Sequence, residues 1–186
     1  MRHFSQILLC LTAVGCATAG QNLPADKIED PEASASLEQF LRDGFTAADK
    51  GDFSYWSNSA CPDALMWDVD EKGVPFAAKG KEAVKAAMDG FAKMIQDSHG
   101  SMKSDLTNLF CRSSTNVGFC AVEFSQVMTM NGQAMPAMKF RGTAVARRFQ
   151  DKWIWTHWHA SMNEAPAPAT AAAAVPAAQA PAAAQP

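Results

Sequence analysis

The stretch that decides the fold is Trp153-Ile154-Trp155-Thr156-His157-Trp158-His159-Ala160-Ser161. It holds three of the five tryptophans and two of the four histidines, and it contains no glycine or proline. Aromatic and β-branched residues favour a strand, and side chains on a strand alternate between its two faces. Neither face would be fully polar, so we expect both faces to be covered and the strand to lie away from the edge of its sheet.

Strict alternation assigns the side chains of this stretch to two faces. One face would carry Trp153, Trp155, His157, His159 and Ser161, and the other would carry Ile154, Thr156, Trp158 and Ala160. We expect the histidine face to look into the interior of the domain and the Ile154/Trp158 face to look towards a partner subunit.

Both ends of the chain differ in composition from a folded core. Residues 1–19 begin with a basic residue, become apolar and end in small residues, which is typical of an export signal. The apolar run is too short to span a bilayer as a permanent helix. Residues 165–186 carry no charge and are rich in alanine and proline, which predicts a disordered tail. Residues 20–33 predict a linker, and residues 34–164 predict one folded domain.

The predicted signal is compatible with two processing routes. Ala17-Thr18-Ala19 is an ordinary cleavage site, whereas Ala13-Val14-Gly15-Cys16 is similar to a bacterial lipobox in which Cys16 is lipidated. We therefore expect an exported protein, periplasmic or secreted, that contacts a membrane only through a lipid on Cys16. The net charge of −3 and the absence of a basic patch argue against nucleic-acid binding.

Three cysteines fall within the predicted domain: Cys61, Cys111 and Cys120. Cys111 and Cys120 flank a turn region at Ser113–Gly118, so they can face each other across a hairpin. A disulfide between them is compatible with an exported chain, and two buried thiols are the alternative.

Hydrophobic periodicity predicts helices first and strands afterwards. Ser36 is the predicted cap of a first helix, and a second long helix follows Gly80. Between the helices, Ala64–Val69 is predicted as a strand. Three further strand-like runs lead into the Trp153–Ser161 stretch, at 105–112, 119–130 and 137–149, with a hairpin signal at Asn131-Gly132. This order predicts an α+β fold in which a curved antiparallel sheet wraps around the helices.

Several short segments together resemble a known family. Lys50-Gly51-Asp52 follows an amphipathic helix, and Arg141-Gly142-Thr143-Ala144-Val145 leads to Asp151-Lys152-Trp153 and then to His157-Trp158-His159-Ala160-Ser161. Over about residues 34–163, this pattern resembles the SnoaL-like branch of the nuclear transport factor 2-like superfamily. Within that branch it is similar to the association domain of calcium/calmodulin-dependent kinase II.

The resemblance implies a cone-shaped α+β fold, an open cavity between sheet and helices, and a homodimer through the outer face of the sheet. Many association domains carry an arginine directly after the second histidine, where this chain has Ala160. A pocket for acidic ligands that depends on that arginine is therefore not carried over to this chain.

His157 and His159 are the first candidates for chemistry. On one strand face their rings could converge on a metal, with a third ligand from Asp68, Asp70 or Glu123. No spacing selects one of these carboxylates, and the resembled family has no fixed metal site. We therefore expect pocket-lining histidines, no metal and no cofactor.

Two functions remain open from the sequence. The first is a non-enzymatic ligand-binding or association module with an apolar pocket for a small molecule, lined by Trp56, Trp67, Arg141, Trp155, His157 and His159. The second is a small-molecule lyase or isomerase in which His159 and Asp68 move a proton inside the pocket. A cavity plugged by its own side chains is a further alternative.

Overall fold

The computed structural model describes residues 29–70 and 73–163. The predicted signal at 1–19, the lipidation candidate Cys16 and the predicted tail at 165–186 lie outside the described residues. The elements in chain order are α1 Pro31–Asp49, α2 Ser54–Asn58, β1 Ala60–Val69, β2 Pro75–Lys79, α3 Lys81–Asp97, β3 Ser101–Ser113, β4 Val117–Met130, β5 Gln133–Ala134, β6 Met138–Phe149 and β7 Lys152–Met162.

The strands form one curved sheet in the order β2-β1-β7-β6-β4-β3, and β5 pairs with β4. The α+β class with helices against a curved sheet is confirmed. The sheet is mixed, because β1 runs parallel to β7 while the other pairs are antiparallel. The Trp153–Ser161 stretch forms most of β7, which lies between β1 and β6 and is not an edge strand, as predicted.

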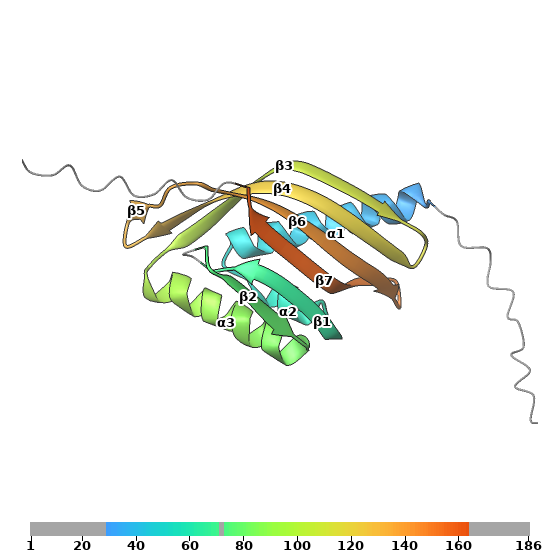
Figure 1. Cartoon of the computed structure of the whole chain (residues 1–186), viewed down its shortest axis with the longest axis horizontal. Helices are drawn as coiled ribbons and strands as arrows, with labels where there is room; N and C mark the ends of the chain where they lie inside the picture. Colours follow the sequence, from blue (N-terminus) through green and yellow to red (C-terminus); the bar gives the residue numbers. More distant parts are fainter. Residues whose placement is uncertain (1–28, 71–72, 164–186) are drawn as a thin grey trace, which may run out of the picture.

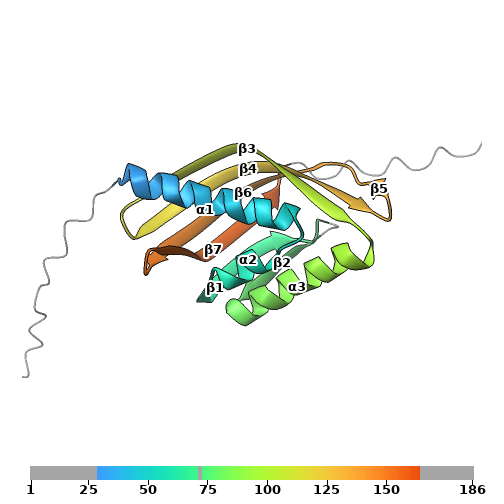
Figure 2. The ribbon, with the colours of Figure 1, turned by 180° about the vertical axis from the view of Figure 1, so that it is seen from behind.

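The helices cover the inner, concave face of the sheet. Figure 1 shows β3, β4, β6 and β7 arching over α1, with α3 beside β1 and β2. The view from behind shows α1 crossing the long strands and α2 lying between α1 and α3 (Figure 2). Leu37 and Leu41 of α1 and Val84 of α3 have no exposed surface, and they anchor the helices to the core. Within the described residues, no helix packs on the outer face of the sheet.

The first helix begins earlier than the sequence reading predicted. Asp30 caps it by accepting a hydrogen bond from the Ala33 backbone N–H at 3.1 Å, and Pro31 occupies the first turn. The prediction of Ser36 as the cap is wrong, because Asp-Pro is a stronger start signal: the missing N–H of proline costs nothing in the first turn. The Ser36 hydroxyl instead accepts a hydrogen bond from the Trp153 indole at 3.2 Å.

The first strand pair is longer than predicted. β1 begins at Ala60 and continues through Cys61-Pro62, and β2 was not predicted as a strand. β1 is irregular between Ala60 and Leu65 in its pairing with β7, which accommodates the proline that cannot donate to a regular ladder.

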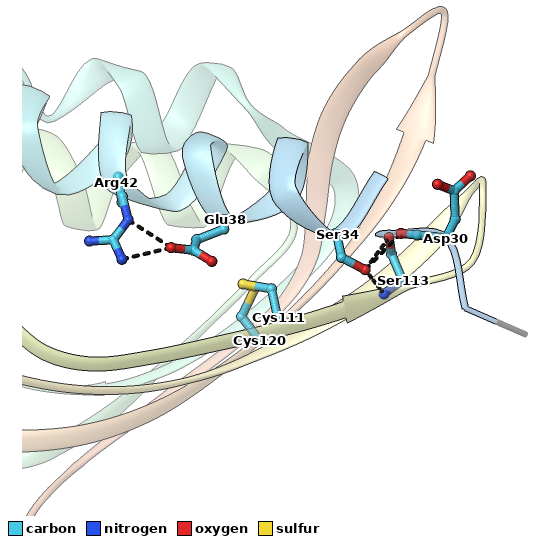
Figure 3. The surroundings of a disulfide bond; sticks show 7 residues. All are labelled: Asp30, Ser34, Glu38, Arg42, Cys111, Ser113 and Cys120. Atoms are coloured by element: carbon cyan, nitrogen blue, oxygen red, sulfur yellow. Dashed lines mark hydrogen bonds and ion pairs between the residues drawn. A yellow bond between two sulfur atoms is a disulfide. The ribbon is translucent and has the colours of Figure 1, made fainter. Parts of the chain in front are cut away.

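Cys111 and Cys120 form a disulfide, with their Cα atoms 4.1 Å apart on directly paired positions of β3 and β4. Figure 3 shows the bond beneath α1, beside Glu38 and Arg42. A β-bulge between Leu106 and Asn108 adds one residue, Thr107, to β3. This extra residue changes the alternation of β3, so that Cys111 lies on the inner face together with Cys120.

The disulfide generates a prediction about stability. Replacing Cys111 and Cys120 together by alanine should lower the free energy of unfolding by about 2–3 kcal/mol, because the unfolded chain loses its cross-link. Thermal unfolding followed by circular dichroism measures the change. A reductant should lower the midpoint of the unmodified protein and leave that of the double variant unchanged. Equal midpoints for the two proteins without reductant would contradict this role.

Candidate functional site

A cavity of about 510 Å³ lies between the inner face of the sheet and the helices. Its walls are mostly apolar and come from every helix and from six strands, and aromatic rings make up much of the lining. The lining residues are Leu41, Phe45, Ala48, Phe53, Trp56, Met66, Asp68, Val69, Asp70, Phe76, Ala87, Met88, Gly90, Phe91, Met94, Met102, Phe124, Gln126, Phe140, Ala144, Trp155 and Trp158.

A β-bulge in β7 determines which of its side chains reach the cavity. Trp155 pairs with Ala146 and His157 pairs with Val145, so Thr156 is an extra residue on β7. The Thr156 hydroxyl donates to the Val145 carbonyl oxygen at 3.2 Å. Trp155 points inward before the bulge, and Trp158 points inward after it.

Because of the bulge, the two histidines lie on the face of the sheet opposite to the one predicted. His157 and His159 do not line the cavity, and they lie on the outer face of the sheet. The expectation that the histidine face looks inward and that Trp158 looks towards a partner is wrong, because strict alternation fails at Thr156. Ala160 is 3% exposed and packs in the core, so its position faces the interior.

Of the other predicted pocket residues, two line the cavity and two lie on the outer face of the sheet. Trp56 and Trp155 line the cavity. Trp67 is 49% exposed on the outer face, where it pairs with His159 across the two strands. Arg141 is exposed and lies 3.4 Å from the Ser161 hydroxyl, so it does not point into the cavity. The predicted orientation of Trp67 and Arg141 into a pocket is therefore wrong.

Asp68 is the buried acidic group of the cavity wall. One carboxylate oxygen accepts a hydrogen bond from the Trp158 indole N–H at 2.9 Å, and the other accepts one from the Val69 backbone N–H at 2.8 Å. Burial raises the pKa of Asp68 above its ordinary value, while these two hydrogen bonds and the charge of His159 oppose that rise. Ionised Asp68 therefore costs folding free energy, and that cost disappears when the carboxyl is protonated at low pH.

The His159–Asp68 proton-transfer pair is not formed in the cavity. Asp68 faces the interior and His159 faces outward, so a substrate in the cavity would contact the carboxyl and not the imidazole. Tyr55 does not line the cavity; its hydroxyl donates to the Phe40 carbonyl oxygen at 3.0 Å, and burial raises its pKa to about 12. The phenol is therefore fixed as a structural donor.

The residues predicted as alternative metal ligands lie on opposite faces of the sheet. Asp68 and Asp70 line the cavity, whereas His157, His159 and Glu123 lie on the outer face. Within residues 29–70 and 73–163, no group of three or more histidine, cysteine, aspartate or glutamate side chains could hold a metal ion.

Trp56 reaches the cavity because α1 has a glycine beneath it. A Cβ atom on Gly44 would lie 2.4 Å from an indole carbon of Trp56, so the ring packs directly against the helix backbone. The ring also makes an edge contact with Phe45, with centroids 5.8 Å apart, and contacts Trp158 with centroids 6.0 Å apart. Sequence analysis did not identify Phe45, Phe124 or Trp158 as lining residues.

The fold and the cavity define an α+β cone of the ligand-binding or enzyme-like class. The model of the SnoaL-like domain family matches residues 37–165, and the chain belongs to that family. No curated protein matches the chain in sequence.

Solved structures share the fold at low sequence identity. An NTF2-like protein from Pseudomonas putida KT2440 is 18% identical with a TM-score of 0.60, covering 72% of this chain and 88% of its own. A Xanthomonas campestris protein described as a calcium/calmodulin-dependent protein kinase II association domain is 18% identical with a TM-score of 0.55, covering 75% and 91%. A ketosteroid isomerase-like protein from Erwinia carotovora atroseptica is 14% identical with a TM-score of 0.56, covering 73% and 99%.

The packing of Trp56 on α1 generates a prediction. Gly44→Ala should destabilise the protein by about 1–3 kcal/mol, because the added methyl group collides with the indole even though alanine favours helix. Gly90→Ala is the matched control, since a Cβ atom at Gly90 of α3 meets no atom within 4 Å. The control should gain about 0.5–1 kcal/mol. Chemical denaturation monitored by tryptophan fluorescence measures both, and a stabilising Gly44→Ala would contradict the proposed contact.

Proposed function

We propose that this protein binds an apolar small molecule in the cavity and acts as a non-enzymatic ligand-binding module. The observation that carries the proposal is a cavity of about 510 Å³ lined by aromatic and aliphatic side chains with few polar groups. Ligand pockets in proteins have this size and composition, and a few polar groups fix the orientation of the ligand.

Small residues in the cavity wall support binding over a plugged core. Ala48, Ala87, Gly90 and Ala144 each stand where a larger side chain would fill part of the space. Well-packed protein cores leave few voids larger than a water molecule. A cavity of this volume is therefore better explained by an occupant than by incomplete packing.

The polar groups of the lining support binding over catalysis. Among the described lining residues, the ionisable groups are Asp68 and Asp70, and no histidine, lysine, arginine, tyrosine or cysteine accompanies them. Acid–base catalysis usually pairs the base with a second group that stabilises the charge developing on the substrate, and the imidazoles and the phenol lie outside this lining. The alternative lyase or isomerase loses its imidazole partner, because His159 lies on the opposite face.

A pair of adjacent alanines on α3 tests the binding site. Ala87 lines the cavity and is half-buried, whereas Ala86 is exposed. Ala87→Trp should weaken binding of the uncharged dye N-phenylnaphthylamine at least about tenfold, because the indole occupies the cavity. Ala86→Trp should bind as the unmodified protein does. Fluorescence titration measures both affinities, and equal affinities in the two variants would place the dye elsewhere.

We propose further that the protein is a homodimer through the outer face of the sheet. An outer patch crosses β3, β4, β6, β7 and β1, and it consists of Leu65, Trp67, Phe110, Phe119, Val145, His157 and His159. Phe110 and Phe119 are each 47% exposed, and their ring centroids lie 6.4 Å apart. Contiguous exposed apolar patches usually mark interaction sites, and a second copy would cover this one.

The outer patch yields a test of assembly. Phe119→Glu should convert a dimer to a monomer, because a buried unpaired carboxylate weakens the interface at least about tenfold. Met135→Glu is the control, since Met135 is 42% exposed but lies near β5, away from the patch. Sedimentation equilibrium measures the mass of each protein. An unmodified protein that is monomeric at all concentrations would contradict the dimer.

Export is the remaining part of the proposal. The Cys111–Cys120 disulfide supports it, since structural disulfides persist mainly in oxidising compartments such as the periplasm. None of the helices in the described ranges is long and apolar enough to cross a membrane. The proposed lipid on Cys16 would attach the protein to a membrane.

A further inference from the structure

Two carboxyl groups supply hydrogen-bond acceptors to the wall of the cavity. Asp68 uses one lone pair on each carboxylate oxygen, for the Trp158 indole and the Val69 backbone N–H. An ionised carboxylate has about four acceptor positions, so acceptor capacity remains for a ligand. Asp70 also lines the cavity, and one of its oxygens accepts a hydrogen bond from the Val74 backbone N–H at 2.8 Å.

Two of the three indole N–H groups on the cavity wall donate to acceptors of the protein. The Trp155 indole donates to the Trp56 carbonyl oxygen at 2.8 Å, and the Trp158 indole donates to Asp68. The Gln126 amide lies 3.4 Å from the Ser104 hydroxyl. A ligand that carries donors is therefore matched by this wall, whereas a ligand that carries only acceptors finds few partners in it.

The charge of the cavity wall also disfavours a ligand that carries only acceptors, above all an anionic one. Within the described lining residues there are two carboxyls and no lysine, arginine or histidine. The sides contributed by α1, α2, α3 and β2 are apolar, and His159 acts on Asp68 only from the far side of the sheet. An anionic ligand would leave its charge buried without a partner, which is costly.

Aromatic rings beside Asp68 also favour a cationic ligand. Phe45, Trp56, Phe124 and Trp158 form one cluster on the wall that also holds Asp68. Trp158 belongs to both features, since its indole N–H binds the carboxylate and its ring belongs to the cluster. Aromatic rings attract cations through their negative faces, and the attraction is larger where water is excluded.

We propose that the occupant of the cavity is an amphiphilic cation, an apolar molecule that carries a protonated amine, with its ammonium group on Asp68. This inference rests on the proposed binding function and names its ligand class. The ammonium donates to the free acceptor positions of Asp68, the neighbouring rings contact its positive charge, and the apolar body fills the space between α3 and the sheet. Carboxylate ligands are excluded.

The ion pair makes affinity depend on pH. Burial raises the pKa of Asp68, and a bound ammonium favours the ionised carboxylate. Affinity for the amine is therefore greatest above the pKa of Asp68 in the free protein and falls as the pH is lowered through it. A neutral ligand of the same shape has no such dependence on the ionisation of Asp68.

Three probes with one ring system test the proposal on the full chain with its disulfide intact. Naphthylmethylamine is cationic at neutral pH, naphthylmethanol is uncharged and naphthoic acid is anionic. Isothermal titration should give an affinity for the amine about ten- to hundredfold higher than for the alcohol, as for a charge-assisted hydrogen bond, with the acid weakest. Lowering the pH through the pKa of Asp68 should narrow the difference in affinity between the amine and the alcohol.

Asp68→Asn separates charge from shape, because asparagine keeps an oxygen for the Trp158 indole. The variant should lose the preference for the amine and keep the affinity for the alcohol. Asp105→Asn, on an exposed position of β3, removes the same charge outside the cavity and should keep the preference. Circular dichroism verifies that both variants are folded.

The outcomes distinguish this inference from the proposed function. If the alcohol or the acid binds as tightly as the amine, the proposal of a cationic ligand is contradicted, while the proposed binding function is retained. A preference for the amine that persists in Asp68→Asn also overturns the assignment to Asp68. If none of the three probes nor the uncharged dye binds, the proposed function itself fails. The comparison in the unmodified protein does not depend on the folding of any variant.

Discussion

The arrangement of the site depends on one extra residue in the central strand. Thr156 interrupts the alternation of β7, so that Trp153 and Trp155 before it and Trp158 and Ala160 after it all face the helices. With regular alternation, Trp158 would be on the outer face and a histidine would take its place in the cavity. The carboxylate of Asp68 would then lose its indole donor. The character of the cavity, aromatic with one buried acid, therefore depends on this bulge.

The same device occurs in β3. Thr107 is the extra residue there, and its hydroxyl donates to the Glu123 carbonyl oxygen at 3.1 Å, as the Thr156 hydroxyl donates to that of Val145. In each case the threonine side chain donates to a carbonyl of the neighbouring strand beside the interruption in the ladder. The bulge in β3 brings Cys111 to the inner face, where it bonds with Cys120. The bulge in β7 brings Trp158 to the cavity. Two local irregularities thus determine both the covalent link and the site.

The sequence was sufficient for the architecture and insufficient for the site. The α+β class and the hairpins follow from periodicities that extend over many residues, so a local error does not change them. The faces of a strand are different, because one extra residue reverses every assignment beyond it. Trp155, before the bulge, was assigned correctly, and His157 and His159, after it, were not. The extent of β1 and the presence of β2 depend on pairing with distant strands, which Cys61-Pro62 and Pro75–Lys79 do not reveal locally.

The reversal also explains why the two faces of β7 suit different partners. The inner face presents indole rings to an apolar cavity that also holds two carboxyl groups, which suits a small molecule with a donor. The outer face presents His157 and His159 between Trp67 of β1 and the Phe110–Phe119 pair of β3 and β4. Imidazoles can both donate and accept hydrogen bonds, so they can find partners at a protein interface, whereas an unpaired buried charge is costly there. Inside an apolar cavity the same rings would need partners that its walls do not offer. The position of the bulge therefore separates polar groups that would be costly on the wrong face, and the proposed ligand site and the proposed assembly surface use different side chains of this one strand.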